Sequence, residues 1–407
     1  MWNKRPRRYH ILQIELTEPL KDISVPMDAE GVALVLRADD IPVGFLMEEC
    51  RPGLRIDRRT VAAKALETAG RRILAERIYA ELRGPTIRRT FPGLDIAICT
   101  HQRTSELERC LESLRALGDV SVIVIDNAPR DKRTAEVVKK FSHARYVVEP
   151  KPGLDFARNR AIREAKGELL AFLDDDVVVD RGWLRGLQEA WAANPDAGGF
   201  TGPILPLALE TRAQITFERM GGFGKSFERM RFGSEVPNVP TYPVGAGIFG
   251  AGANMVFRRD LLEALGGFDE ALDTGATLPG GGDLDMFYRV VRSGHALVRE
   301  PRLLVYHEHR REYSHLRHQM WTWGQGTMAY LTKAWRADPE ARPKIRRWVV
   351  WWLSFQLSKM FFPYLRRNRG CWPWTMVLAE IFGAVAGVCG QYDRSMNQIE
   401  ELRRQFT

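Results

Sequence analysis

The chain has 407 residues, of which 45% are apolar and 27% are charged, and its formal net charge is +9. This composition is that of a folded globular protein and excludes a disordered or fibrous chain. The length allows one large domain with additions or two to three ordinary domains, and no repeat at a fixed period indicates a solenoid.

The excess positive charge is concentrated near the end of the chain. Between residues 342 and 370 there are eight basic residues and no acidic one. They are Arg342, Lys344, Arg346, Arg347, Lys359, Arg366, Arg367 and Arg369. Since these charges nearly account for the net +9, the remainder is close to neutral, and we expect no nucleic-acid partner.

Cysteine usage indicates the compartment. The five cysteines (Cys50, Cys99, Cys110, Cys371 and Cys389) are scattered, with no CxxC pair and no metal-ligand spacing. An odd number of this kind points to a reducing environment. The first residues are basic but lack the long apolar core of a secretory signal, so we expect a cytoplasmic protein.

Residues 1–90 are expected to form a small α+β accessory domain. The segments 9–16 and 31–47 have strand character, and a turn at 37–40 breaks the second. A helix is predicted over 58–84, where Gly84 and Pro85 end it. No group of catalytic or metal-binding residues occurs in this part.

Residues 91–312 alternate between strand and helix signals. Apolar strands are predicted at 94–99, 120–126, 144–149 and 168–174, separated by helices at 104–117, 131–141 and 155–167. This alternation predicts a parallel sheet with helices on both faces. The segment 204–247 reads as irregular, and after it we expect a strand at 250–257 and helices at 258–267 and 280–294.

Polar residues follow the predicted strands, where open α/β sheets bind their ligands. The strand at 168–174 runs into Asp174, Asp175 and Asp176. Three like charges in a row repel one another, whereas paired carboxylates after a strand can hold Mg²⁺ or Mn²⁺ against phosphate groups. We therefore predict a divalent-cation site in which the first and third aspartates converge. The alternative is a polar loop after a buried strand.

Six segments carry a resemblance to a known family. They are "DIAICTHQR", "VIVIDNA", "KPGLDFARNRAI", "FLDDDVVVDRGWL", "GANMVFRRDLLEALGGFDE" and "GGGDLDMFYRV". In order and spacing they resemble family 2 glycosyltransferases, which are inverting, nucleotide-sugar-dependent enzymes of the GT-A fold. The resemblance covers residues 93–310, just over half of the chain.

The resemblance implies a role for each matching residue. The donor-binding residues would be Thr100, Arg103, Asp126, Asn127, Gly153, Arg158, Asn159, Asp174 and Asp175. The metal would be held by Asp174 and Asp176 of the D-x-D, with His307 near the diphosphate. Asp283 takes the place of the general base, with Asp285 beside it.

The sequence departs from the family pattern at two positions. The residue before the catalytic aspartate is usually Glu, and here it is Gly282, which bears on the choice of the base. The second strand ends Asp-Asn rather than Asp-Asp. The resemblance therefore implies that Asn127 contacts the nucleobase of the donor less directly.

Several of these residues have structural alternatives. Asp126 and Asp283 are the kind of residue that caps a helix. His307 and His309 fit a basic surface loop, and Arg158 fits an exposed helix face. Each alternative can be separated from the functional interpretation by the burial and the contacts of the side chain.

The C-terminal region, 313–407, is helical, basic and rich in Trp. The segment 346–370 joins aromatic residues to basic flanks but is interrupted by polar residues and Pro363, which fits a helix at a membrane interface better than one that spans it. A second apolar stretch, 375–390, contains Glu380, which argues against burial in hydrocarbon. The alternative is that both are core helices packed on the catalytic domain.

Together these features predict a metal-assisted inverting glycosyltransferase of the GT-A fold, peripheral on the inner face of the cell membrane. Its expected partners are a nucleotide-diphosphate sugar, a glycan or lipid-linked acceptor and an anionic membrane surface. One alternative is a sugar-phosphate nucleotidyltransferase, which would carry a glycine-rich basic loop that "CTHQRTSE" lacks. The other is a non-catalytic scaffold on the same fold, against which the intact aspartates argue.

Overall fold

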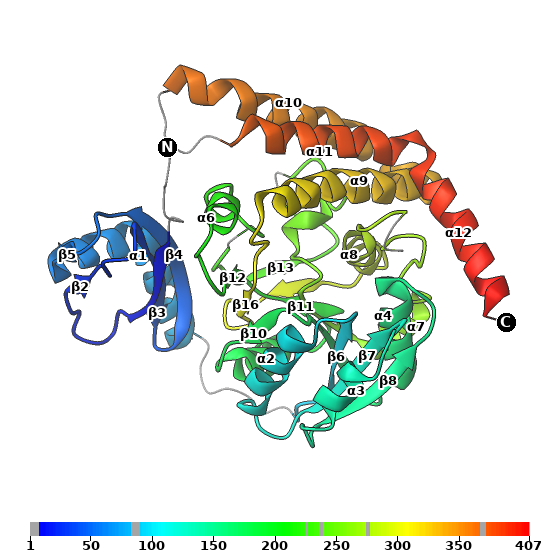
Figure 1. The fold of residues 1–407 in the computed structure, drawn as a ribbon, viewed down its shortest axis with the longest axis horizontal. Coiled ribbons are helices and arrows are strands. Elements are labelled where there is room, and N and C mark those ends of the chain that lie inside the picture. The colour runs from blue at the N-terminus through cyan, green and yellow to red at the C-terminus, as the bar shows by residue number, and fades with distance from the viewer. Residues whose placement is uncertain are drawn as a thin grey trace.

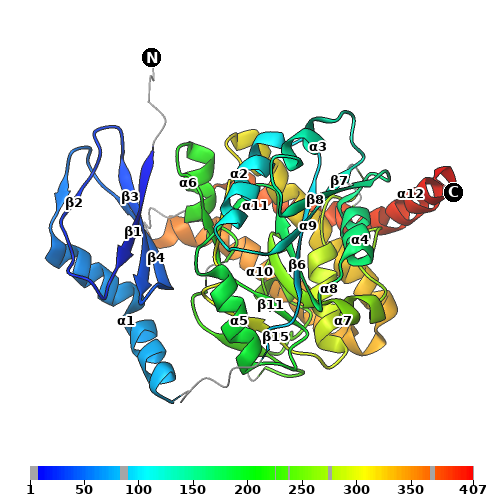
Figure 2. The same cartoon turned by 90° about the horizontal axis from the view of Figure 1, so that it is seen from below.

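The computed structural model describes residues 8–82, 90–224, 226–236, 239–273, 277–366 and 372–406. Three parts follow one another along the chain: a small N-terminal unit, a central body built on a large sheet, and long C-terminal helices (Figure 1). The N-terminal unit stands beside the central body, and the long helices cross one side of it (Figures 1 and 2).

The N-terminal unit is a three-stranded sheet with a long helix packed on it. Its elements are β1 (Tyr9–Glu15), β2 (Ile23–Ser24), β3 (Gly31–Ala38), β4 (Ile41–Glu49), β5 (Arg55–Ile56) and α1 (Arg58–Leu82). Asp39 and Asp40 join β3 to β4 with positive φ angles of 52° and 63°, as a tight hairpin turn requires. The predicted strands and helix are present, while Gly84 and Pro85 lie outside the described residues.

A buried ion pair joins this unit to the central body. The guanidinium of Arg37, on β3, donates to both carboxylate oxygens of Asp180, at 2.9 and 2.8 Å. Both side chains are almost fully buried, and Tyr306 also donates to Asp180 at 3.3 Å. Since each charge is removed from water, loss of either partner would leave the other charge buried and unpaired.

We expect the substitution Asp180→Ala to destabilise the protein by about 3–5 kcal/mol, because it leaves the Arg37 charge buried without a partner. The free energy of unfolding in urea, together with the rate of amide hydrogen exchange in β3, would measure this effect. As a control, Arg181→Ala removes an exposed ion pair with Asp40 and should cost at most about 1 kcal/mol. The double substitution Arg37→Met with Asp180→Leu should recover most of the lost free energy of unfolding. If the single and double variants lose the same amount of stability, this account is contradicted.

The central body is built on an eight-stranded sheet. Its strands are β6 (Leu94–Thr100), β7 (Ser121–Asn127), β8 (Ala144–Glu149), β9 (Leu169–Asp174), β11 (Gly199–Thr201), β13 (Met230–Phe232), β14 (Asn254–Arg258) and β15 (Leu297–Arg299). Across the sheet they follow the order β13-β15-β11-β14-β9-β6-β7-β8. β9, β6, β7 and β8 are parallel, as predicted. β14, whose direction the sequence analysis did not predict, runs antiparallel to both β9 and β11.

Helices cover both faces of this sheet, which confirms the α/β prediction. They are α2 (Thr104–Arg115), α3 (Arg133–Val138), α4 (Leu154–Glu164), α5 (Trp183–Ala193), α7 (Arg259–Ala264) and α8 (Gly282–Arg292). Apolar side chains of α2, α3 and α5 form one core with the sheet. Those of α4, α7 and α8 form a second core on the other face, so the strands are buried on both sides.

The segment predicted to be irregular contains regular elements. They are β12 (Ile204–Pro206), α6 (Arg212–Arg219), β13 and the 3₁₀ turn η1 (Ala246–Ile248). β12 joins β10 (Val177–Val179) and β16 (Val305–His307) in a small second sheet of order β10-β16-β12. This sheet places His307 opposite Val177, directly after the three aspartates.

The C-terminal part consists of long helices layered on the central body (Figure 1). They are α9 (Tyr313–Ala337), α10 (Arg342–Arg366), α11 (Trp374–Ala386) and α12 (Tyr392–Gln405), with short turns η2 (Pro339–Ala341) and η3 (Gly387–Gln391). α9 and α11 approach closely at glycines: a Cβ on Gly324 or on Gly383 would lie 2.0 Å from a backbone oxygen of the other helix. Glycine is therefore required at this crossing.

One candidate membrane span is found among the described residues, by length and composition only. It is Trp374–Gln405, whose most apolar window has a mean hydropathy of 1.3 and is 33% buried. Its backbone leaves the helical region at Cys389 and Gly390, so the segment is two helices joined at a kink. The close packing of α11 on α9 is also what a core helix shows, and the span is weak support for a membrane crossing.

Candidate active site

The carboxyl ends of the parallel strands bring the predicted polar residues together. Register pairs Thr100 with Asp126 across β6 and β7, and Cys99 with Asp174 across β6 and β9. The residues that follow these strands therefore share one edge of the sheet, where such folds bind ligands.

The middle aspartate of the triplet is held by residues of the first strand end. Thr100 donates its hydroxyl to Asp175 at 2.7 Å, and Arg103 donates to Asp175 and Asp176 at 2.9 and 2.8 Å. Asp175 is thus held by Thr100 and Arg103 and does not belong to the group of Asp174, Asp176 and His307. Arg103 offsets part of the charge repulsion within the triplet, which is one reason why it can be buried.

Asp174, Asp176 and His307 form a group that could hold a metal ion, because one ligand atom from each lies within 4.8 Å of the others. Burial, together with the charge of Asp176, raises the pKa of Asp174 to about 7. Burial alone would raise the pKa of Asp176 as well, but His307 and Arg103 lower it. Burial lowers the pKa of His307 to about 4, so its imidazole is neutral at pH 7.

Both histidines of the segment 307–309 are buried, so their interpretation as surface residues is wrong. His307 Nδ1 lies 3.0 Å from His309 Nδ1, and His309 Nε2 lies 2.7 Å from Glu218 Oε1 on α6. The rings of Phe223 and Phe217 pack edge-on against His307 and His309. The second nitrogen of His307 is left facing the aspartates.

The unpaired atoms of this group fit a divalent cation. His307 Nε2 lies 3.2 Å from Asp176 Oδ1. Asp176 Oδ1 is buried and accepts no hydrogen bond among the described residues. A buried oxygen without a donor is costly, and two carboxylates with a neutral imidazole are ordinary ligands for Mg²⁺ or Mn²⁺.

Asp283 faces the same cavity from the first turn of α8. Its Oδ2 accepts a hydrogen bond from the backbone N–H of Gly252 at 2.8 Å, and its Oδ1 from that of Leu284 at 2.8 Å. The cap position of α8 is Gly281, so Asp283 is not the N-cap that the alternative interpretation assumed. The carboxylate is fixed in direction and lines open space.

The structure separates Asp285 from Asp283. Asp285 is almost fully buried and accepts from Arg289 at 2.7 Å and from Lys333 at 2.8 Å. It does not line the cavity. Because two residues along a helix point to different faces, the inclusion of Asp285 in the catalytic pair does not agree with the structure.

Arg158 lies in the cavity wall rather than on an exposed helix face. It is 4% exposed and donates to Asp155 at 2.9 Å and to Asp273 at 3.2 Å. Burial raises the pKa of Asp273 to about 6, and that of Asp155 well above its usual value. The sequence analysis did not include Asp155 and Asp273 among the site residues. The one local feature that they share is an acidic side chain next to a glycine-containing segment.

The glycine at 282 makes room for one of these carboxylates. A Cβ on Gly282 would lie 2.0 Å from Asp155 Oδ2. The carboxylate of Asp155, which comes from α4, therefore occupies the space that a side chain at position 282 would need.

Three other predicted donor-site residues brace loops. Asn127 donates to the backbone oxygen of Lys151 and accepts from the N–H of Gly153. Asn159 both donates to and accepts from the backbone of Phe268, at 2.9 and 2.7 Å. None of Asn127, Gly153 and Asn159 lines the cavity.

Asp126 is fully buried at the end of β7, where Tyr146 donates to it at 2.8 Å. Burial raises its pKa. The neighbouring helix α3 is capped at Lys132, so Asp126 is not its cap. Its position at the strand end remains the predicted one for a nucleoside contact.

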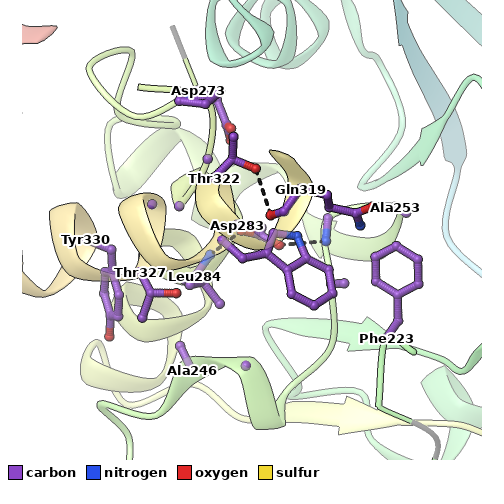
Figure 3. Close-up of a pocket in the computed structure, with 18 of the residues that line it drawn as sticks. Phe223, Ala246, Ala253, Asp273, Asp283, Leu284, Gln319, Thr322, Thr327 and Tyr330 are labelled. Carbon is purple, nitrogen blue, oxygen red and sulfur yellow. Dashed lines mark hydrogen bonds between the residues drawn. The ribbon is translucent and has the colours of Figure 1, made fainter. Parts of the chain in front are cut away.

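One cavity of about 520 Å³ connects these groups. Asp174, His307 and Arg310 line one part of it, and Arg158, Asp273 and Asp283 line another. A third part comes from α9, α10 and α11 and includes Trp348, Trp352 and Glu380. Figure 3 shows Asp283 between Ala253, beside the strand end, and Thr327 and Tyr330 on α9. The cavity thus joins a cation-binding group, a fixed carboxylate and an aromatic end.

Comparison with known proteins finds similarity mainly in the central body. Residues 95–266 match the model of glycosyl transferase family 2. A pre-mycofactocin glycosyltransferase of Mycobacterium tuberculosis is 26% identical over 63% of this chain and 51% of its own. The succinoglycan biosynthesis protein ExoM of Rhizobium meliloti is 29% identical over 52% of this chain and 66% of its own. A glucosyl-dolichyl phosphate glucuronosyltransferase of Haloferax volcanii is 23% identical over 43% of this chain and 56% of its own.

The similarity has clear limits along the chain. This chain spans about half to two thirds of the length of these curated relatives. The matched family region includes the aspartate triplet but ends before Asp283 and His307. The N-terminal unit and α9–α12 lie outside it, so their contributions to the site must be argued from the structure.

Proposed function

We propose that the protein, whose residues 95–266 match the model of glycosyl transferase family 2, transfers a sugar, with inversion, from a nucleotide-diphosphate donor to a glycan or lipid-linked acceptor. The observation that carries this proposal is the single cavity in which a cation-binding group and a fixed carboxylate face each other. A single displacement needs both: charge stabilisation for the departing diphosphate and a base for the incoming hydroxyl.

The donor would lie across the carboxyl edge of the sheet. Asp126 and Arg103 flank the nucleoside position, and Asp174, Asp176 and His307 would hold Mg²⁺ or Mn²⁺ beside the diphosphate. When bound, the cation supplies positive charge that stabilises the leaving diphosphate. Arg158 and Arg310, which line the cavity, add fixed positive charge beside this group.

Asp283 would be the general base. Its two hydrogen bonds from backbone N–H groups hold the carboxylate in one direction. It takes the proton from the acceptor hydroxyl as the bond to the sugar carbon forms and the bond to the diphosphate breaks. Asp155 and Asp273 hold Arg158 in the wall behind it.

The family match disfavours a nucleotidyltransferase, and a non-catalytic scaffold would have no use for an oriented Asp283. A thermal-shift screen of nucleoside diphosphates and their sugars, with and without Mn²⁺, separates these possibilities. We expect one nucleotide sugar, together with Mn²⁺, to raise the melting temperature, since a ligand that binds only the folded state stabilises it. If no nucleotide stabilises the protein, the proposed donor site is wrong.

We further propose that the C-terminal helices hold the protein on an anionic membrane surface. Arg346, Arg347 and Lys344 belong to the basic stretch at the start of α10. Large apolar side chains are exposed on the same helix, among them Val350, Trp351, Leu353, Phe355 and Leu357. Basic residues add on the order of 1 kcal/mol each near anionic lipid, and inserted aromatics add a salt-insensitive part. Arg367 and Arg369 lie outside the described residues.

We therefore expect the full-length protein to sediment with vesicles that contain anionic lipid, and high salt to weaken this binding without abolishing it. The substitutions Trp351→Ser and Phe355→Ser should remove the salt-resistant part, because both rings are exposed and stack on each other. Leu66→Ser, an exposed apolar residue of the N-terminal unit, is the matched control. A full-length protein that stays in the supernatant at low salt would refute the membrane proposal.

A further inference from the structure

The cavity extends from Asp283 to an end that only the C-terminal helices provide. Trp348 and Trp352 of α10 and Glu380 of α11 line this end. Of the nucleoside-contacting candidates, neither Arg103 nor Asp126 lines the cavity. The space beyond the cation group is therefore separate from the nucleoside position, and it lies where the transferred sugar and its acceptor must meet.

Glu380 is out of place for a packing residue. It is the one charged residue between 374 and 391, on a helix that otherwise offers apolar and small side chains. Burial raises its pKa, while Lys359, Gln356 and Trp352 act in the opposite direction. The side chains of Gln356 and Trp352 hydrogen-bond this carboxylate and the charge of Lys359 acts on it, which offsets part of the cost of its burial. Glu380 also lines the open cavity.

Aromatic rings stand beside this carboxylate. The indoles of Trp348 and Trp352 are stacked, with centroids 6.2 Å apart and planes 15° from parallel. A sugar offers an apolar face of C–H groups and an edge of hydroxyl donors. Flat rings next to a hydrogen-bond acceptor are complementary to both features.

The same aromatic row continues out of the cavity to the protein surface. The ring centroids of Trp348 and Trp351 are 6.2 Å apart, and those of the stacked rings of Trp351 and Phe355 are 5.5 Å apart. Trp351 and Phe355 are about half exposed, and α11 adds the exposed Phe382, Val385 and Val388. An apolar group attached to a sugar in the cavity would thus have a continuous apolar path to the outside.

We propose that Trp348, Trp352 and Glu380 form an acceptor subsite, and that the acceptor is a glycoside with an apolar aglycone, as in a lipid-linked sugar. Glu380 accepts hydrogen bonds from hydroxyls of the acceptor sugar, and its aglycone leaves along Trp351 and Phe355. This subsite rests on the proposed transferase function and goes beyond it by naming the class of acceptor.

Short-chain detergents with sugar heads test this subsite directly. The probes are n-octyl β-glucoside, galactoside and mannoside below their micelle concentrations, with the matching methyl glycosides and octanesulfonate for comparison. Quenching of tryptophan fluorescence reports binding. We expect at least one octyl glycoside to bind tenfold or more tightly than its methyl analogue and than octanesulfonate.

Two variants divide the contributions. Glu380→Gln keeps the shape of the side chain and should weaken the binding of that octyl glycoside at least tenfold. Trp352→Leu should also weaken its binding, because the ring is lost. Glu400→Gln on α12, an exposed carboxylate outside the cavity, should change nothing. If no octyl glycoside binds, or if all variants bind it equally, the subsite is refuted. Nucleoside diphosphate binding measured on the same samples shows separately whether the donor site, and with it the proposed function, is intact.

Discussion

Asp283→Asn is expected to lower turnover by roughly 10²–10⁴ while leaving donor binding unchanged. The amide keeps the size of the side chain, and its oxygen can still accept from the backbone N–H of Gly252, 2.8 Å from Oδ2 in the wild type. It cannot take a proton, so the loss falls on the chemical step alone. Steady-state transfer rates at saturating donor, together with the donor Kd, measure the two effects separately.

Asp285→Asn is the matched control for this substitution. Asp285 lies two residues further along α8 and serves as the partner of Arg289 and Lys333. Its substitution should reduce stability, because two cations lose a buried partner, and the folded fraction should retain its turnover. A variant set in which Asp285→Asn is inactive and Asp283→Asn is normal would reverse the assignment of the base.

Removal of the cation is expected to have the second large effect. The reference is the affinity of the wild type for nucleoside diphosphate in Mn²⁺. This affinity should fall at least tenfold when EDTA replaces Mn²⁺, and at least tenfold in the variant Asp176→Asn. Asp176 Oδ1 is a buried oxygen without a hydrogen-bond donor among the described residues, so a cation is what it is placed to meet. Calorimetric titrations with and without Mn²⁺ provide the comparison.

Asp196→Asn is a suitable control for the metal experiment. Asp196 is an exposed aspartate paired with Arg231, far along the chain from the triplet and absent from the cavity wall. It should leave the metal dependence intact. Equal nucleotide affinity of the wild type in EDTA and in Mn²⁺ would remove the basis for assigning a metal to Asp174, Asp176 and His307.

Local patterns were sufficient to predict the elements of the catalytic half. Apolar runs that end in Thr100, Asp126 and Asp174 predict strands whose ends gather polar groups, and the structure brings these ends together. The direction of β14 was not predictable in this way. A buried strand has the same apolar pattern whether it runs parallel or antiparallel to its neighbour.

The parts of the site that the sequence did not indicate are those made by distant segments. Asp155 fills the space beside Gly282, and Glu218 meets His309 from a helix 91 residues earlier. No periodicity or spacing in the sequence predicts either contact, because each depends on how the helices pack over the sheet. Glu380 stood out in the sequence as a charge in an apolar stretch, but only the fold places it in the cavity wall.

The stereochemistry of transfer tests the central proposal most directly. With the nucleotide sugar that stabilises the protein in the thermal screen, proton NMR during early turnover reports the anomeric configuration of the transferred or released sugar. A single displacement in which Asp283 deprotonates the incoming hydroxyl or water predicts inversion relative to the donor. A product with retained configuration would contradict that mechanism and the role given to Asp283.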